Sequence, residues 1–256
     1  MAVGFSRAVG ALAAVVIAAG CAPEYPSPLS TEVQQTYFIE EVDIYVSDDA
    51  WVDWPVGEQK VKEQFGISTE PRFKAGTDAR DEPQEVRPPE IDVKRTDWGR
   101  EALQKLARDR FEELVKPRLL GSLSGTKPAH MSVVLASVVM ADPGVTLFIG
   151  PSDSTIYAGF QVFDKQTGEP LSPKSARLAR VVARGGLIET LIQEGFDLNF
   201  DYTAMNYGGL VKEWIEATDL VMIPEREDLL TFKEDIPGPV LEEVAPTGEE
   251  VAEPTS

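Results

Sequence analysis

The stretch Met131-Ser-Val-Val-Leu-Ala-Ser-Val-Val-Met140 is apolar or small at every position. A half-buried strand alternates apolar and polar side chains, whereas a strand that is covered on both faces is apolar throughout. Residues 131–140 therefore predict a central strand of a sheet, with other parts of the chain packed on both of its faces.

Two further segments predict strands beside this centre. Residues 156–163 alternate, and a Gly-containing turn over residues 164–169 follows them, so they form a meander with the central strand. Residues 37–46 alternate as well, with Glu41 and Asp43 on the polar side. The apolar sides of these two strands carry Ile156, Ala158, Phe160 and Val162, and Phe38, Val42, Ile44 and Val46.

Three helices are expected around the strands. The first begins at Asp97, a candidate N-terminal cap, and a second covers residues 178–192 with a kink at Gly185-Gly186. A third helix covers residues 205–215. The order of elements predicts an α+β fold, in which helices pack on a small, mostly antiparallel sheet.

The two ends and one internal stretch have a different composition. Residues 22–30 hold three prolines, so we expect residues 21–35 to form a flexible tether. Residues 234–256 hold seven acidic residues and no Lys or Arg, which predicts a disordered acidic tail. Between them a single domain, residues 36–233, is expected. Its Pro-rich residues 55–95 form either a long surface excursion or a short hairpin at residues 62–67.

Composition excludes several classes of function. The 256 residues include 43 acidic and 24 basic ones, for a formal charge of −19. A nucleic-acid binder needs clustered Lys and Arg to neutralise phosphates, so nucleic acid is not an expected partner. The single His and single Cys also argue against zinc sites built from Cys and His clusters, and against Cys-His nucleophiles.

The first 20 residues have the pattern of a secretory signal peptide. Arg7 precedes an apolar run over residues 8–19, and small residues lead to Cys21. The run is shorter than the roughly 20 residues that span a bilayer. Ile17-Ala-Ala-Gly20-Cys21 resembles the lipobox of bacterial lipoproteins. The resemblance implies cleavage between Gly20 and Cys21.

The lipoprotein resemblance also implies a modification and a location. A lone cysteine cannot form an intramolecular disulfide, which leaves a free thiol or a lipid anchor as its chemistry. In lipoproteins the cysteine carries a diacylglycerol and its amino group a further acyl chain such as palmitate, and three chains make membrane attachment effectively permanent. Ala22, where an Asp signals inner-membrane retention, implies the outer membrane, with the domain facing the periplasm.

A second resemblance lies at the predicted turn. Phe163-Asp164-Lys165-Gln166-Thr167-Gly168-Glu169 is similar to a strand end in the curli-secretion lipoprotein and in lipoprotein activators of penicillin-binding proteins. This remote resemblance implies an envelope location and a non-catalytic role, and it transfers no functional residues.

Motifs for catalysis are incomplete. Gly121-Ser-Leu-Ser-Gly125 has Leu123 at the position where a nucleophile elbow needs serine, so we interpret it as a turn. His130 stands just before the central strand, and we interpret it as a turn or packing residue rather than a general base. The chain is therefore expected not to be an enzyme, and no cofactor is expected.

Two acidic groups are weak candidates for a cation. Asp197, Asn199 and Asp201 match the first three ligand positions of a calcium loop, but Tyr202 and Gly208 stand where glycine and a bidentate glutamate are needed. A structural turn with Asp201 capping a helix is the favoured interpretation. The group Asp48, Asp49 and Asp53 is interpreted as a solvated acidic loop rather than a cation site.

Trp51 and Trp54 follow the first predicted strand. If the strand continues, we expect both indoles on the same side, as a ligand platform or a partner surface. The alternative is that both cover the sheet edge as part of the core.

These observations favour a non-enzymatic lipoprotein that is anchored in the outer membrane and displays its domain for contacts with an envelope protein partner. The alternative is a lipid-anchored binding protein for a small molecule or a cation near the two tryptophans. A pocket of ligand size beside the indoles would favour the alternative.

Overall fold

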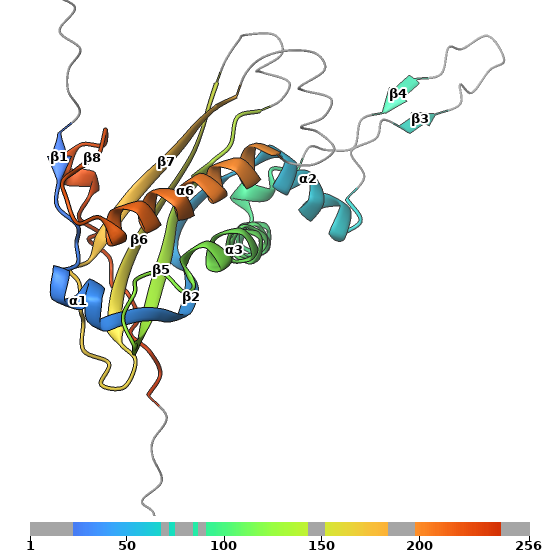
Figure 1. Ribbon diagram of the computed structural model, residues 1–256. Coiled ribbons are helices and arrows are strands. Elements are labelled where there is room, and N and C mark those ends of the chain that lie inside the picture. Colours follow the sequence, from blue (N-terminus) through green and yellow to red (C-terminus); the bar gives the residue numbers. More distant parts are fainter. Residues whose placement is uncertain are drawn as a thin grey trace, which may run out of the picture.

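The computed structural model describes residues 23–67, 72–74, 84–86, 91–142, 152–183 and 198–241. At their centre is a four-stranded sheet with the strand order β2-β5-β6-β7 (Figure 1). β2 pairs parallel with β5, and the other two pairings are antiparallel. The expected α+β class and mostly antiparallel sheet are therefore confirmed. The four strands are β2 (Tyr37–Asp53), β5 (Lys127–Val139), β6 (Ser152–Asp164) and β7 (Ser175–Ala183).

β5 is the buried central strand that its apolar run predicts. Met131, Val133 and Leu135 are fully buried in the main core, while Val134 belongs to a smaller cluster on the other face. Successive side chains of a strand point to opposite faces, so an apolar run of this length needs a cover on both sides. Helices cover one face of the sheet, and the C-terminal segment covers the other.

Two helices, α3 (Asp97–Leu119) and α6 (Leu198–Glu216), cover one face of the sheet (Figure 1). The predicted cap of α3 is off by one residue, because the hydroxyl of Thr96 accepts the bond from the Gly99 amide at 3.2 Å. α6 begins at Leu198, well before the predicted start. The buried side of α3 consists of Gly99, Leu103, Ala107, Phe111, Val115 and Leu119, at the spacing expected of a helix.

The other face, which we call the outer face, is covered by the C-terminal segment, residues 230–241. Its Phe232 and Ile236 pack in a cluster with Val134, Phe163 and Ala176. Residues 234–241 were expected in the disordered tail, and that expectation is wrong for them, since Ile236 is 8% exposed. Ile236, which follows the acidic Glu234 and Asp235, provides the buried area in these residues. Residues 242–256 lie outside the described residues.

The expected tether is also folded where the structure describes it. β1 (Glu24–Tyr25) pairs antiparallel with β8 (Val221–Met222), and α1 (Thr31–Thr36) follows. The Pro26 carbonyl accepts a hydrogen bond from Trp214 Nε1 at 2.8 Å, and Leu29 is buried. The tether prediction is wrong here because proline removes a donor but keeps its carbonyl acceptor.

Residues 55–95 contain more structure than expected. The predicted hairpin at residues 62–67 is wrong, because α2 (Pro55–Gln64) is a helix that buries Val61, and proline is favourable at a first helical position. The remaining elements are β3 (Arg72–Lys74), which pairs antiparallel with β4 (Gln84–Val86), and the short 3-10 helices η1 (Val93–Arg95) and η2 (Glu227–Leu229).

The bounds of two other elements differ from those that the sequence predicts. The helix predicted over residues 178–192 is wrong up to residue 183, because these residues belong to β7; residues 184–192 lie outside the described residues. β2 is longer than the predicted 37–46. A bulge between Ile39 and Glu41 shifts its alternation, so that Ile39 instead of Phe38 enters the core.

Candidate functional site

Polar side chains of β2 and β5 meet on the outer face of the sheet. The parallel register places Glu41 opposite His130 and Asp43 opposite Ser132. The intervening Val42 and Met131 point into the core between the sheet and the helices. Alternation along two strands, together with this register, brings four polar side chains to one place.

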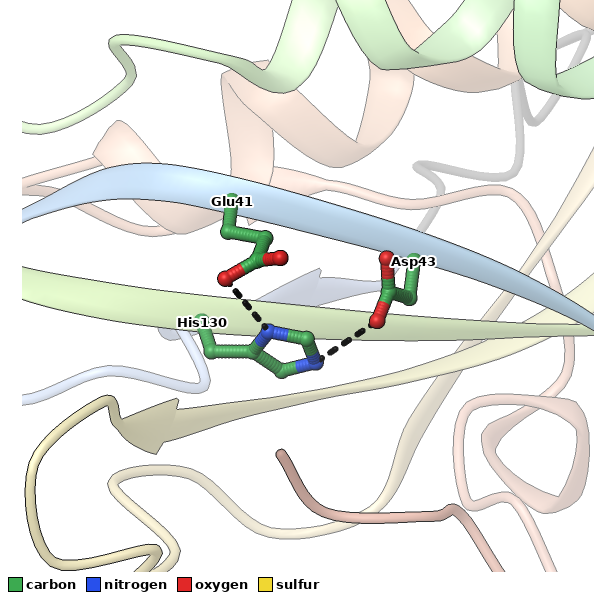
Figure 2. A group of neighbouring side chains, drawn as sticks. All are labelled: Glu41, Asp43 and His130. Atoms are coloured by element: carbon green, nitrogen blue, oxygen red, sulfur yellow. Dashed lines mark ion pairs between the residues drawn. The ribbon is translucent and has the colours of Figure 1, made fainter. Parts of the chain in front are cut away.

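His130 is the centre of this group, which we call the His130 cluster: Glu41, Asp43, His130 and Ser132. Figure 2 shows the imidazole ring of His130 lying between the carboxylates of Glu41 and Asp43. Nδ1 is 3.8 Å from Glu41 Oε2, and Nε2 is 3.8 Å from Asp43 Oδ2. The His130 side chain is 1% exposed, while both carboxylate side chains are about two-fifths exposed, at 43% and 41%. The ring is therefore buried, and the two carboxylates next to it remain partly exposed to solvent.

Ser132 connects the cluster to the C-terminal segment. Its hydroxyl donates to the Pro237 carbonyl at 2.5 Å and lies 3.0 Å from His130 Nε2. His130 Nδ1 is buried and has no hydrogen-bond partner. The ring is thus held from one nitrogen only, and the other nitrogen faces Glu41.

A pocket of about 700 Å³ opens over the cluster. That volume is within the roughly 300–1,000 Å³ of small-molecule sites. Lys165 contributes the positive charge, with Nζ 2.8 Å from Glu40 Oε2 and 3.0 Å from Glu41 Oε2. The lining residues are Glu40, Glu41, Asp43, Pro128, His130, Lys165, Gln166, Pro239, Val240 and Leu241.

The pKa values of Glu41 and of the neighbouring Tyr45 are shifted by their surroundings. The hydrogen bond from Lys165 holds the pKa of the Glu41 carboxyl below its usual value. Burial raises the pKa of the Tyr45 phenol, and the negative charge of the neighbouring Asp43 raises it further. At neutral pH the cluster therefore holds an ionised Glu41, and the phenol of Tyr45 next to Asp43 is neutral.

His130 was expected before the strand as a turn or packing residue; the position and the turn role are wrong, while its 1% exposure agrees with packing. His130 lies within β5, between Glu41 of β2 and Phe163 of β6. The sequence signals that point to the cluster are the polar alternation of Glu41 and Asp43 and that of His130 and Ser132. Neither segment alone shows that the two strands pair. It is this pairing that brings the two sets of polar side chains together.

Trp51 and Trp54 lie in opposite environments, so the expectation that both indoles share one side is wrong. Trp54 is 1% exposed and stacks on Phe200, with ring centroids 4.4 Å apart. Trp51 is 58% exposed. An odd spacing of three residues on extended backbone points side chains to opposite faces. Trp54 is core, and Trp51 alone remains a candidate contact residue.

The depression beside Trp51 is small, at about 160 Å³. Its lining includes Asp48, Asp49, Lys94 and Arg100. Asp53 is not part of it and pairs with Lys94 Nζ at 2.8 Å. This volume is below that of typical small-molecule sites. A pocket of ligand size thus lies at the His130 cluster, whereas the depression beside the indole of Trp51 is smaller than one.

The calcium-loop residues do not form a loop site in the described structure. Asn199 and Asp201 lie in the first turn of α6, and Asp197 lies outside the described residues. Asp201 is inside the helix rather than at its cap, and Arg110 binds both of its carboxylate oxygens, at 2.8 and 2.5 Å. The guanidinium of Arg110 thus binds the Asp201 carboxylate that calcium would need as a ligand.

The remaining predicted features have simple outcomes. Gly121 and Leu123 adopt positive φ angles of 72° and 69°, which confirms a turn over residues 121–125. Gly20, Cys21 and the whole of residues 1–22 lie outside the described residues. Among the described helices, none is long and apolar enough to cross a membrane.

Comparisons with known proteins assign no family to the chain. No family model and no curated protein matches the sequence. Among solved structures, the chain is similar to a candidate lipoprotein from Caulobacter crescentus CB15, solved at 2.40 Å resolution. The two are 10% identical with a TM-score of 0.28, and the match covers 44% of this chain and 80% of that chain. A TM-score this low does not establish a shared fold.

Proposed function

We propose that the chain is a non-enzymatic lipoprotein, anchored in the outer membrane through Cys21, whose α+β domain contacts an envelope protein partner in the periplasm. The lipobox-like sequence before Cys21 supports the anchor. The observation that carries the contact function is the exposure of three large aromatic side chains.

The three exposed aromatic residues are Trp51, Phe65 and Trp98. Trp51 is 58%, Phe65 52% and Trp98 37% exposed. The rings of Phe65 and Trp98 are in contact, with centroids 4.7 Å apart. Trp51 lies by itself in a depression that it shares with Arg100 of α3. Tryptophan and arginine are enriched among residues that dominate the energy of protein interfaces.

The small size of the depression beside Trp51 favours a protein over a small molecule. It is too small to enclose a drug-sized ligand, whereas an exposed ring of this size can insert into a pocket of a partner. Lys94, Arg100, Asp48 and Asp49 line the same depression and provide charges of both signs beside Trp51.

The position of the N-terminal residues supports the anchor. β1 begins three residues after Cys21 and pairs with β8. Beside it, Leu220 and Met222 are 58% and 63% exposed. Apolar side chains next to a lipidated residue can add buried area at the membrane interface.

The environment of Ser132 supports a non-enzymatic role. Ser132 is fully buried, and its hydroxyl proton is donated to Pro237 rather than to His130. A serine nucleophile needs the opposite arrangement, with its proton directed to the histidine and its oxygen open to substrate.

Photo-crosslinking in intact cells tests the contact function. A photoreactive residue at position 51 should give a defined crosslinked adduct, while the same residue at position 202 should not. Tyr202 is a matched control, since it is 53% exposed and lies on α6. Once the partner is identified, Trp51→Ala should weaken its binding about thirtyfold, equivalent to a hot-spot loss of about 2 kcal/mol. Equal crosslinking from both positions, or none from either, would contradict the proposal.

A further inference from the structure

The protons of the His130 cluster can be assigned from its hydrogen bonds. A serine hydroxyl has one proton, and that of Ser132 goes to the Pro237 carbonyl at 2.5 Å. Ser132 Oγ can therefore only accept at its other contact, 3.0 Å from His130 Nε2. Nε2 carries the ring proton, and in the neutral ring Nδ1 is left with a lone pair.

That lone pair faces a carboxylate. Nδ1 is buried, has no hydrogen-bond partner, and lies 3.8 Å from Glu41 Oε2. The separation is longer than a hydrogen bond of about 2.7–3.2 Å. Two groups that can both only accept are thus held face to face in a buried place, an arrangement that a cation between them would satisfy.

The spacing is suited to a metal ion. Zinc bonds to imidazole nitrogen and carboxylate oxygen are about 2.0–2.2 Å long, so two ligand atoms of a tetrahedral ion lie about 3.4 Å apart. The 3.8 Å between Nδ1 and Glu41 Oε2 is close to this separation. Asp43 is the candidate third ligand, because one ligand atom from each of Glu41, Asp43 and His130 lies within 4.8 Å of the other two. Its Oδ2 lies 3.8 Å from Nε2, so its carboxylate has to turn toward Nδ1 when the ion binds. Both carboxylates are partly exposed and can rotate, while the buried ring stays fixed by Ser132.

We propose that Glu41, Asp43 and His130 bind a divalent first-row transition-metal cation such as zinc. An imidazole ligand favours such ions over calcium and magnesium, which prefer oxygen ligands alone. Ser132 and the Pro237 carbonyl act as the outer shell that fixes the tautomer and orientation of the ring. The pocket above leaves room for water or a partner ligand to complete the coordination.

The charge around the site agrees with a cation. Among the described pocket-lining residues, Glu40, Glu41 and Asp43 are opposed by Lys165 alone. Lys165 competes for the same Glu41 oxygen but also holds Glu40 at 2.8 Å, so it can stay with Glu40 when the ion binds. The site is therefore predicted to bind more tightly when Lys165 is removed.

Calorimetric titration of the untagged full chain with zinc, after stripping with a chelator at neutral pH, tests this site. We expect one zinc ion per chain. His130→Gln, Glu41→Gln and Asp43→Asn should each weaken binding by at least about a hundredfold, since even outer-shell changes cost about 10- to 100-fold. Lys165→Gln should strengthen it. Glu32→Gln, an exposed carboxylate on α1, should bind as the unmodified chain does.

Two results would overturn the site. One is the absence of stoichiometric binding by the unmodified chain. The other is equal binding by all variants, which would mean that zinc is held loosely by the acidic surface. If the buried His130→Gln variant does not fold, the two carboxylate variants decide, because their side chains are about two-fifths exposed. Crosslinking from position 51 is independent of all these outcomes.

Discussion

At the scale of single residues, Trp51 and Trp54 differ most sharply. Trp54 is buried under Lys60 and against Phe200, with its ring 4.4 Å from that of Phe200. Trp51 is on the surface. The contribution of an indole to the free energy of unfolding depends on its burial, because only the truncation of a buried side chain leaves a cavity.

Trp54→Ala should therefore lower the free energy of unfolding by about 3–5 kcal/mol. Trp51→Ala should change it by no more than about 0.5 kcal/mol. Denaturant unfolding followed by circular dichroism measures both. A surface-like effect for Trp54→Ala would show that its indole is not in the core.

The buried ion pair of Arg177 and Glu225 is the second residue-scale feature. Arg177 Nε is 3.1 Å from Glu225 Oε1, and the side chains are 2% and 4% exposed. The guanidinium also lies over the ring of Trp214, 5.5 Å from its centroid. Burial lowers the pKa of Arg177, and the charge of Glu225 opposes this shift. The carboxylate is thus needed to keep a cation inside the fold.

Removing that carboxylate with Glu225→Ala should cost about 3–5 kcal/mol of stability, since an uncompensated charge stays buried. The double variant Arg177→Met with Glu225→Met should recover much of the loss. Glu112→Ala breaks a partly exposed pair with Lys116 and should cost at most about 1 kcal/mol. Thermal unfolding of the three variants decides; a Glu225→Ala loss no larger than that of Glu112→Ala would refute the account of the buried pair.

At the scale of elements, the contact of β6 with the C-terminal segment is close. A Cβ atom built on Gly159 would lie 2.2 Å from Cγ of Phe232. Such a contact is far inside van der Waals distance, and the Phe232 ring lies in a packed cluster. Glycine at position 159 is what lets the Phe232 ring lie flat on the outer face.

Gly159→Ala is expected to displace Phe232 and loosen residues 230–241 from the sheet. Amide exchange should become faster at Ala176 and Phe232, whose NH groups bond to Leu230 and Lys174 across this contact. Gly209→Ala on α6 is the control, because nothing lies within 4 Å of its added Cβ. Unchanged exchange in Gly159→Ala would mean that the segment is not held by this ring.

The elements also show what the sequence could and could not predict. β5 and β6 were predictable because their alternation or apolar run is set by local burial. β7 was mistaken for a helix, because buried Arg177 and the small Ala176 and Ala179 hide the period of two that a strand shows. The His130 cluster was missed for another reason: it depends on the parallel register of β2 and β5, which brings together residues 89 positions apart.

At the scale of the whole molecule, the folded N-terminal residues change how the domain meets the membrane. With Cys21 lipidated, only Ala22 and Pro23 separate the anchor from β1. An extended chain spans at most about 3.6 Å per residue, so β1 lies within roughly 11 Å of the lipidated residue. The proposed anchor would thus hold the domain against the bilayer instead of on a long tether, and a partner would have to meet it there.

Mass spectrometry of the protein purified from membranes tests the proposed anchor at Cys21. We predict a chain that begins at Cys21, with a diacylglycerol on its sulfur and an acyl chain on its amino group, while Cys21→Ser leaves an uncleaved or soluble form. An unmodified Cys21 in a chain that still begins at Met1 would contradict the central claim.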